Sequence, residues 1–231
     1  MDIDFTFLRE GPYLGWLLMG AMRTLALFAA AWVMGFLLAL LIVAVRASPV
    51  PLLQRLCMAF VGYHRNVPGL VQIFFWYFGI SQLLPQSWQD AINASHSEFV
   101  FALIALSLNT AAYMSEDIRS GIRSLPPTQF EAARALGLSY LRAMYRVVLP
   151  QAVRISVPPL VNQSLSLFKS TSLAMAIGVA EMTYVSRQIE NETFRSMEAF
   201  AIASVFYLLM SFLIMGVGGW SQHRLQTAGV H

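Results

Sequence analysis

Residues 24–45 read TLALFAAAWVMGFLLALLIVAV, a run of 22 positions without a charged side chain. As a helix this run is about 33 Å long, enough to cross the hydrocarbon core of a bilayer. Only 12% of the 231 residues are charged and 57% are hydrophobic, whereas a soluble domain carries about 25% charged residues. The sequence therefore predicts an integral membrane protein, with residues 1–231 forming a single transmembrane domain.

Five stretches are predicted to cross the membrane as helices, so the fold is expected to be all-α. They are residues 24–45, 58–84 with a break at Pro68, 99–118, 157–185 and 199–220. An odd number of crossings places the two termini on opposite sides of the membrane. The first residues, MDIDFTFLRE, start with acidic side chains, unlike the basic start of a signal peptide.

Arginine positions predict the orientation of these helices. The segment between the third and fourth stretches carries Arg119, Arg123, Arg134, Arg142, Arg146 and Arg154. Short cytoplasmic loops carry an excess of Lys and Arg. We therefore expect this central segment, about 119–156, and the C-terminus to be cytoplasmic, with the N-terminus outside.

The central segment is too polar to cross a membrane and too regular for a flexible linker. Thr128 is expected to cap a short helix, with Glu131 completing a capping box, and Gly137 is expected to end it. A second helix is predicted from about Tyr140 to Val148, before Pro150. Such a helical hairpin either lies on the lipid surface or docks against another protein.

This segment resembles the EAA loop of ATP-binding-cassette (ABC) importer permeases. The matching pattern is EAA at 131–133, Gly137, and VVLP at 147–150. RNVPGLVQIFFWYFG and LPQAVRISVPPLVNQSLSLFKSTSLA are similar to polar amino acid permeases of that class, notably the glutamate/aspartate type. The resemblance covers about residues 13–220 and implies the five-helix type I permease fold. It also implies that the residues coupling the chain to an ATPase are Glu131, Ala132, Ala133, Gly137 and Leu138.

The same resemblance implies partners and a location. They are a cytoplasmic ABC ATPase dimer that holds ATP and Mg, a second permease subunit, identical or paralogous, and an external solute-binding protein. The expected location is a bacterial inner membrane. The sequence has no G-x-x-x-x-G-K-[ST] phosphate loop, so ATP hydrolysis is assigned to a partner and the chain is not expected to be an enzyme. No metal site, cofactor or nucleic-acid partner is predicted.

Two predicted spans carry polar side chains at helical spacing. The first set is Asn109, Tyr113 and Glu116, and the second is Asn162, Ser166 and Lys169. Positions i, i+4 and i+7 share one helix face. Polar faces inside a membrane turn toward the bundle interior or a water-filled cavity, so both sets are predicted to line a substrate pathway.

Lys169 is the only lysine among fifteen basic residues. In one interpretation its ammonium binds a substrate carboxylate, with hydroxyl contacts from Ser170 and Thr171. In the other, backbone carbonyls or a neighbouring helix satisfy it. Its depth favours a meeting with Asn109 or a substrate over an ion pair with Glu116.

Glu116 is expected to pair with Arg119 or Arg123, near the cytoplasmic end of its helix, rather than to contact substrate. Elsewhere, Pro68 lacks a backbone donor and frees carbonyls upstream. Broken helices are tolerated where they line cavities. The residues around this break, Asn66, Pro68 and Gln72, are therefore either gate or pathway residues or parts of a packing kink.

Two other classes of function are weighed against an ABC permease. A secondary transporter or channel that needs no ATPase is favoured by inverted internal repeats, which the sequence does not display. A membrane-bound hydrolase needs a nucleophile and base, and the sequence has no G-x-S-x-G or H-E-x-x-H pattern. The predicted function is therefore the transmembrane subunit of an ATP-driven importer of a polar amino acid.

Overall fold

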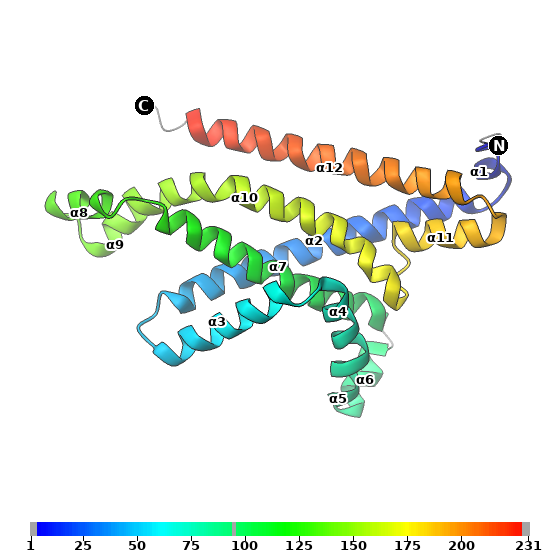
Figure 1. Cartoon of the computed structure of the whole chain (residues 1–231), viewed down its shortest axis with the longest axis horizontal. Helices are drawn as coiled ribbons and strands as arrows, with labels where there is room; N and C mark the ends of the chain where they lie inside the picture. Colours follow the sequence, from blue (N-terminus) through cyan, green and yellow to red (C-terminus); the bar gives the residue numbers. More distant parts are fainter. Residues whose placement is uncertain (1–3, 94–95, 228–231) are drawn as a thin grey trace.

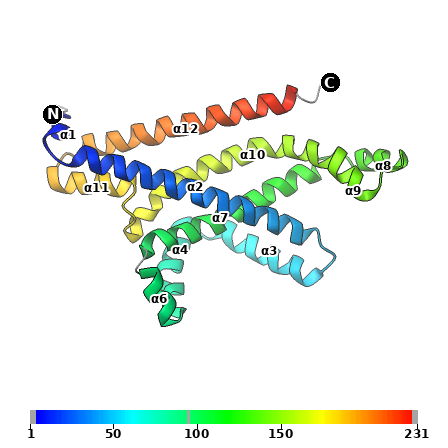
Figure 2. The same cartoon turned by 180° about the vertical axis from the view of Figure 1, so that it is seen from behind.

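The computed structural model describes residues 4–93 and 96–227, and its regular elements there are all helical. Within the described ranges, three helices are long and apolar enough to cross a membrane. They are α2 (Tyr13–Arg46), α7 (Ser97–Arg123) and the stretch Ser196–Arg224 of α12 (Ser196–Thr227). All three extend along the long axis of the molecule (Figures 1 and 2). These correspond to the first, third and fifth predicted spans.

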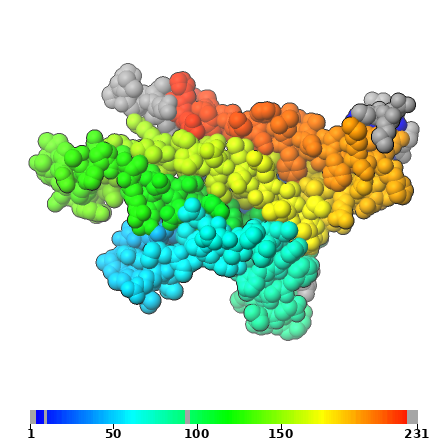
Figure 3. Space-filling model, in the orientation of Figure 1, coloured from blue at the N-terminus to red at the C-terminus, as the bar shows by residue number. Residues whose placement is uncertain are grey.

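The second predicted span is divided at Pro68, as the sequence indicates. Helix α3 occupies Pro51–Asn66; beyond the break follow α4 (Gly69–Phe74), the π-helix η1 (Phe75–Ile80), α5 (Ser81–Leu83) and α6 (Gln86–Asn93). The part from α4 to α6 projects sideways from the long axis as a separate lobe (Figures 1 and 3). The predicted break at Pro68 therefore separates α3 from α4, which point in different directions (Figure 1).

The fourth predicted span, between 157 and 185, falls in a helical run that begins earlier in the chain. Its helical run includes α9 (Tyr140–Ala143), the π-helix η2 (Met144–Val148), α10 (Leu149–Ser170) and the 3₁₀ helix η3 (Thr171–Ile177). It ends at Gly178, whose φ of +93° is a left-handed conformation that favours glycine. A new helix, α11, occupies Met182–Thr193. Pro150 does not end the second short helix, because it falls in the first turn of α10 directly after η2.

The core lies where α2, α7, α10 and η3 meet. It contains Leu27 and Ala31 of α2, Ala105 of α7, Leu167 of α10 and Ile177 of η3, all buried. Small residues on the facing helix surfaces allow the backbones to approach closely, as is usual in membrane bundles.

Two glycines show how close this approach is. A Cβ added to Gly35 of α2 would lie 3.0 Å from Cβ of Thr110 on α7. A Cβ added to Gly121 of α7 would lie 2.9 Å from the backbone oxygen of Ala152 on α10. Any larger residue at either position forces the helices apart.

The short helix α8 (Pro127–Ala135) and α9 lie at one end of the long axis. Helix α1 (Phe7–Glu10) and α11 lie at the other end, and α12 extends from there back toward the α8–α9 end (Figure 1). The first and last described helical turns are therefore at opposite ends of the molecule.

Candidate functional site

The segment from α8 to α9 presents most of its side chains to the outside. Glu131 and Ala132 are exposed, whereas Ala133 is buried against the rest of the chain. Gly137 has a φ of +82°, so it ends α8 in the left-handed conformation predicted from the sequence. The amide of Leu138 donates to the Ala133 carbonyl at 3.2 Å, which closes the turn in the usual glycine-terminated form.

The predicted start of α8 is wrong. The helix begins at Pro127 after Pro126, and no side chain caps it, so Thr128 lies inside the first turn instead of before it. The prolines fix φ near −65°, Pro126 has no side-chain oxygen that could act as a cap, and the Gln129 amide donates to the Pro126 carbonyl at 3.1 Å instead. Glu131 therefore has no part in a capping box, and its carboxylate is exposed.

Large apolar side chains are exposed on the same end of the molecule, in the chain that follows Glu131. The exposed fractions are 85% for Leu136, 77% for Leu141 and 76% for Tyr145. Sequence reasoning missed these three residues; apolar residues on helices too short to bury them were the available signal. Exposed apolar side chains beside a carboxylate form a surface suited to a protein partner.

The break between α3 and α4 is held together by Gln72. Its side chain is fully buried, and Nε2 donates to the carbonyls of His64 at 3.0 Å and Val67 at 2.7 Å. Its Oε1 lies 2.6 Å from Nδ1 of His64. The carbonyls at the end of α3 lack intrahelical partners at a break, and Gln72 supplies two of the bonds. This arrangement favours the packing-kink interpretation for Gln72.

Asn66 and Pro68 lie on the exposed side of the same break. Asn66 Nδ2 donates to the Gly62 carbonyl at 2.7 Å, within its own helix. Pro68 directly precedes α4 and has extended backbone angles. Neither residue contacts the predicted pathway residues of α10 in any hydrogen bond of the described chain.

The polar face of α7 contacts α3 and α2. Asn109 Nδ2 donates to the His64 carbonyl at 2.9 Å, and the Tyr113 hydroxyl donates to the Arg65 carbonyl at 3.1 Å. Asn109 therefore meets the end of α3 rather than Lys169. The Arg65 guanidinium lies 5.4 Å from the centre of the Tyr113 ring.

Glu116 pairs with Arg46, the last residue of α2, and not with Arg119 or Arg123 as predicted. The expectation failed because it considered only one helix, whereas α2 packs along α7 and ends beside Glu116. Arg46, Arg65, Tyr113 and Glu116 line a cavity of about 400 Å³ beside α3.

The second predicted face, Asn162, Ser166 and Lys169, is exposed along α10. In the described chain the Lys169 ammonium has no ion-pair or hydrogen-bond partner, so neither backbone carbonyls nor a neighbouring helix satisfy it. Ser170 is half-buried, and Thr171 is fully buried with its hydroxyl donating to the Phe168 carbonyl at 2.7 Å. Thr171 therefore serves the helix end rather than a ligand.

A buried acidic cluster at the start of α11 was not predicted. The Glu181 carboxylate is fully buried and accepts hydrogen bonds from the amides of Thr183 at 2.9 Å and Tyr184 at 2.8 Å. The Tyr207 hydroxyl of α12 also donates to it, at 2.7 Å. A glutamate directly before a helix, three residues after Gly178, was the signal in the sequence. The cluster locks α11 onto α12.

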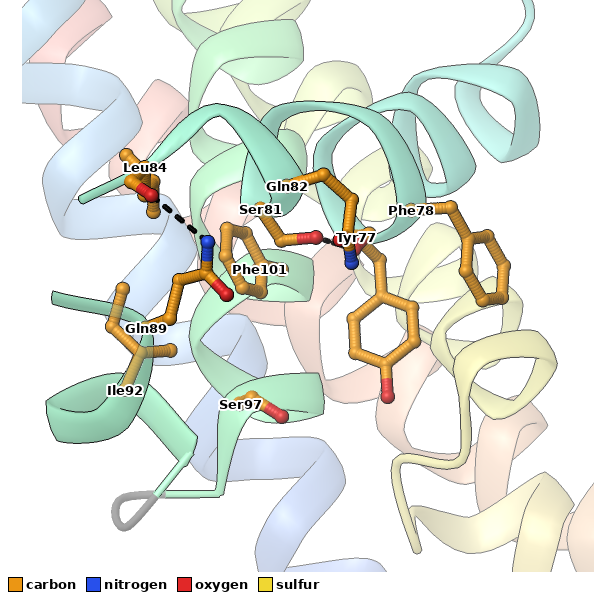
Figure 4. Close-up of a pocket in the computed structure, with 9 residues that line it drawn as sticks. All are labelled: Tyr77, Phe78, Ser81, Gln82, Leu84, Gln89, Ile92, Ser97 and Phe101. Carbon is orange, nitrogen blue, oxygen red and sulfur yellow. Dashed lines mark hydrogen bonds between the residues drawn. The ribbon is translucent and has the colours of Figure 1, made fainter. Parts of the chain in front are cut away.

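A separate cavity of about 270 Å³ opens in the side lobe, between η1, α6 and the start of α7 (Figure 4). Gln89 Nε2 donates to the Leu84 carbonyl at 2.8 Å, and the Ser81 hydroxyl donates to the Tyr77 carbonyl. The rings of Tyr77 and Phe101 form part of the wall. The residues predicted from the sequence to lie on the pathway are not in its lining.

No group of three or more His, Cys, Asp or Glu side chains suited to a metal ion occurs among the described residues. The candidate functional features of the described chain are therefore exposed surfaces and polar helix faces. One end of the molecule presents Glu131 among apolar side chains, and the middle presents an unsatisfied ammonium on α10 and polar groups of α7 beside a cavity.

Comparison with known proteins gives consistent matches over nearly the whole chain. Residues 8–227 match the family described as binding-protein-dependent transport system inner membrane component. The probable amino-acid ABC transporter permease protein PatM of Vibrio harveyi is 33% identical over 230 residues, which cover 100% of both chains. The glutamate/aspartate import permease protein GltJ of Escherichia coli (strain K12) is 33% identical over 241 residues, covering 99% of this chain and 98% of the relative.

A solved structure shares the fold closely. The crystal structure of an amino acid ABC transporter with histidines contains a chain that superimposes with a TM-score of 0.85 at 28% identity. The match covers 97% of this chain and 100% of that one. The helical arrangement described above is therefore that of an ABC transporter permease chain.

Proposed function

This chain belongs to the family of binding-protein-dependent transport system inner membrane components, and we propose that it is the transmembrane subunit of an ABC importer for a polar amino acid. The observation that carries the proposal is the α8–α9 segment, which projects from one end of the bundle with Glu131 and Leu136 exposed. Such a surface has no use in an isolated membrane bundle. It suits docking into a cytoplasmic ATPase dimer, which holds the ATP and Mg.

The remaining partners follow from the same proposal. The exposed polar face of α10 carries Lys169 without a partner, and an unpaired ammonium facing lipid is costly. A second permease subunit, identical or paralogous, covers this face and encloses the pathway between two copies. A solute-binding protein delivers the amino acid on the outer side. The N-terminus lies outside and the C-terminus in the cytoplasm.

The proposed pathway contains Lys169, Asn162 and Ser166 of α10, with Asn109 and Tyr113 of α7 on its wall. The Lys169 ammonium binds the carboxylate of the amino acid, because a compact point charge forms such a contact and releases it readily. Glutamate and aspartate are the first substrates to test, since GltJ is named for their import.

The coupling part of the proposal is tested by ATP-dependent uptake of glutamate into proteoliposomes containing the whole complex. Glu131→Ala is expected to reduce uptake and uptake-stimulated ATP hydrolysis together, at least tenfold. Glu192→Ala, which removes an exposed carboxylate from α11, is the matched control and leaves both unchanged. Uptake that needs no ATP would identify a secondary transporter or channel and contradict the proposal.

The pathway part needs a separate variant. Lys169→Met keeps the length and apolar stem of the side chain and removes its charge. We expect it to assemble normally and lose uptake while its basal ATP hydrolysis continues. If Lys169→Met instead lowers only the yield of assembled complex, Lys169 is a structural residue at the subunit interface.

A further inference from the structure

An apolar groove of about 470 Å³ lies between α2, α10 and α12, apart from the proposed pathway. Phe28 and Trp32 of α2 form one wall, Val161 of α10 its floor, and Leu213 and Val217 of α12 the other wall. Val217 and Leu213 are exposed. The groove is therefore open along the outer surface of the bundle.

The few polar groups in the groove already have partners. The Trp32 indole Nε1 donates to Ser164 Oγ at 2.8 Å, and Ser164 Oγ donates to the Leu160 carbonyl at 2.8 Å. The Ser221 hydroxyl donates to the Gly218 carbonyl at 2.8 Å. The donors among these groups are all used within the chain, and the rest of the lining is apolar, so the groove suits an apolar occupant.

The depth of the groove restricts that occupant further. Phe28 and Trp32 lie near the middle of the 34-residue helix α2, which is long and apolar enough to cross a membrane. Leu213 and Val217 lie in the spanning stretch of α12. The groove therefore opens into the hydrocarbon core, where the available apolar chains are those of lipids.

Two arginines extend the faces that line the groove. Arg154 precedes Val161 by seven residues on α10, and Arg224 follows Val217 by seven residues on α12. A seven-residue step returns to the same helix face, about 10 Å further along. Arg224 lies over the Trp220 ring, with its guanidinium carbon 4.3 Å from the ring centre.

The packing of α10 against α12 places Arg154 and Arg224 at about the same height along the long axis of the molecule. A Cβ on Gly218 would meet the Val161 side chain, and α10 and α12 lie side by side in opposite chain directions (Figures 1 and 2). Seven residues before Val161 is Arg154, and seven after Gly218 is position 225, next to Arg224. By their positions along the two helices, both arginines therefore belong to the end of the groove nearest α8 and α9.

We infer that the groove binds one acyl chain of an anionic phospholipid whose phosphate lies between Arg154 and Arg224. About 16 Å of helix separates Arg224 from Leu213, a length suited to much of an extended acyl chain. Basic side chains between membrane helices on the cytoplasmic side attract anionic headgroups. The choice of the cytoplasmic leaflet rests on the proposed orientation of the chain, whereas binding itself does not.

Native mass spectrometry of the assembled complex, released from nanodiscs of phosphatidylglycerol and phosphatidylethanolamine, tests this inference. The wild type is expected to retain one phosphatidylglycerol per permease chain. Val217→Trp fills the groove, and this variant is expected to lose the bound phosphatidylglycerol. Val205→Trp, a matched change at an exposed position elsewhere on α12, retains it. Equal retention by all three proteins would overturn the inference.

The headgroup contact has its own variants. Arg154→Gln and Arg224→Gln are each expected to lower the preference for phosphatidylglycerol over phosphatidylethanolamine about fivefold, since a basic residue near the surface contributes about 1 kcal/mol. Unchanged preference in the double variant would contradict the placement of the phosphate. Because no ATP is involved, these results are independent of whether the coupling proposal holds.

A second copy of the chain is the competing occupant. Val217→Cys in a Cys57→Ser background reports a two-fold contact through the groove, because such a contact brings the equivalent cysteines of the two copies within reach of a disulfide or a short cross-linker. Efficient cross-linking would overturn the lipid assignment. Ala29→Leu narrows the groove from the α2 side and is expected to lower lipid retention even if Val217→Trp assembles poorly.

Discussion

At the scale of single residues, Gln72 shows how one side chain can be mistaken for part of a pathway. It stands four residues after Pro68 in a broken helix, where a polar group suggests ligand contact. The structure instead buries it fully and uses both ends of its amide on His64 and Val67. The polar group is there because the break leaves carbonyls that need donors.

Replacing Gln72 tests this structural role. Gln72→Leu leaves the carbonyls of His64 and Val67 without their donor, and each buried unsatisfied group costs about 1–3 kcal/mol. We expect a lower midpoint of thermal unfolding for the purified complex, with uptake per folded complex close to that of the wild type. Gln82→Leu, in an exposed position of the side lobe, is the control. A Gln72→Leu complex that is as stable as the wild type but has lost uptake would indicate that Gln72 is a pathway residue.

At the scale of elements, the turn between α8 and α9 is a rigid connection. Gly137 takes a φ of +82°, and its neighbours Arg134 and Leu138 close the turn, with Arg134 Nη1 donating to the Leu138 carbonyl at 2.7 Å. A rigid turn fixes the angle between the two short helices, which a coupling surface requires in order to transmit motion.

The conformation of Gly137 gives a prediction about coupling. Gly137→Ala forces a Cβ into the left-handed region, at a cost of about 1–2 kcal/mol. We expect the turn to change shape and uptake-stimulated ATP hydrolysis to fall severalfold, while the spanning helices stay folded. Gly137→Asn is expected to retain more activity because Asn tolerates this conformation.

The control for this prediction is Gly62→Ala. Gly62 lies in α3, and a Cβ added there meets no atom within 4 Å. ATP hydrolysis in Gly137→Ala that matches Gly62→Ala would show that the geometry of the turn does not matter for coupling.

At the scale of the whole molecule, the first described residue is tied to the last long helix. Arg195 Nη1 donates to the Asp4 carbonyl at 2.6 Å and to Asp4 Oδ2 at 2.9 Å. The Asp4 amide donates to Glu198 Oε1 at 3.3 Å. These contacts join the start of the chain to the entry of α12, across more than 190 residues of sequence.

This contact between Asp4 and Arg195, called the tether below, is predicted to depend on pH. Hydrogen bonds from the Thr6 amide and hydroxyl, together with Arg195, lower the pKa of Asp4 from 3.8 to about 2. A carboxyl whose pKa is lower in the folded state stabilises that state above its unfolded pKa, and this contribution is lost as pH falls through the folded value. The tether is therefore complete above about pH 4 and is released toward pH 2.

Pepsin, which is active in this range, supplies the measurement. At pH 4 the wild type is expected to be cleaved near its N-terminus more slowly than Asp4→Ala. The ratio of the two cleavage rates is expected to approach one as pH falls to 2. Taking this ratio also cancels the effect of pH on the activity of pepsin itself. A ratio that does not change with pH would rule out Asp4 as the titrating group.

Sequence alone determined the features that depend on local composition and backbone chemistry. The uncharged runs predict the membrane helices, because hydrocarbon excludes charges and unpaired backbone groups. Pro68 and Gly137 predict a break and a helix end, and both occur where expected. The family resemblance also followed from sequence, since the EAA pattern lies in one continuous segment.

Tertiary structure decided what depends on neighbours far away in the chain. Glu116 meets Arg46 rather than an arginine of its own helix, and Asn109 meets the end of α3 rather than Lys169. The helical run of the fourth predicted span ends at Gly178, and Glu181, held by Tyr207 of α12, directly precedes the next helix. Helical spacing specifies which residues share a face, but the packing of other helices determines what that face contacts.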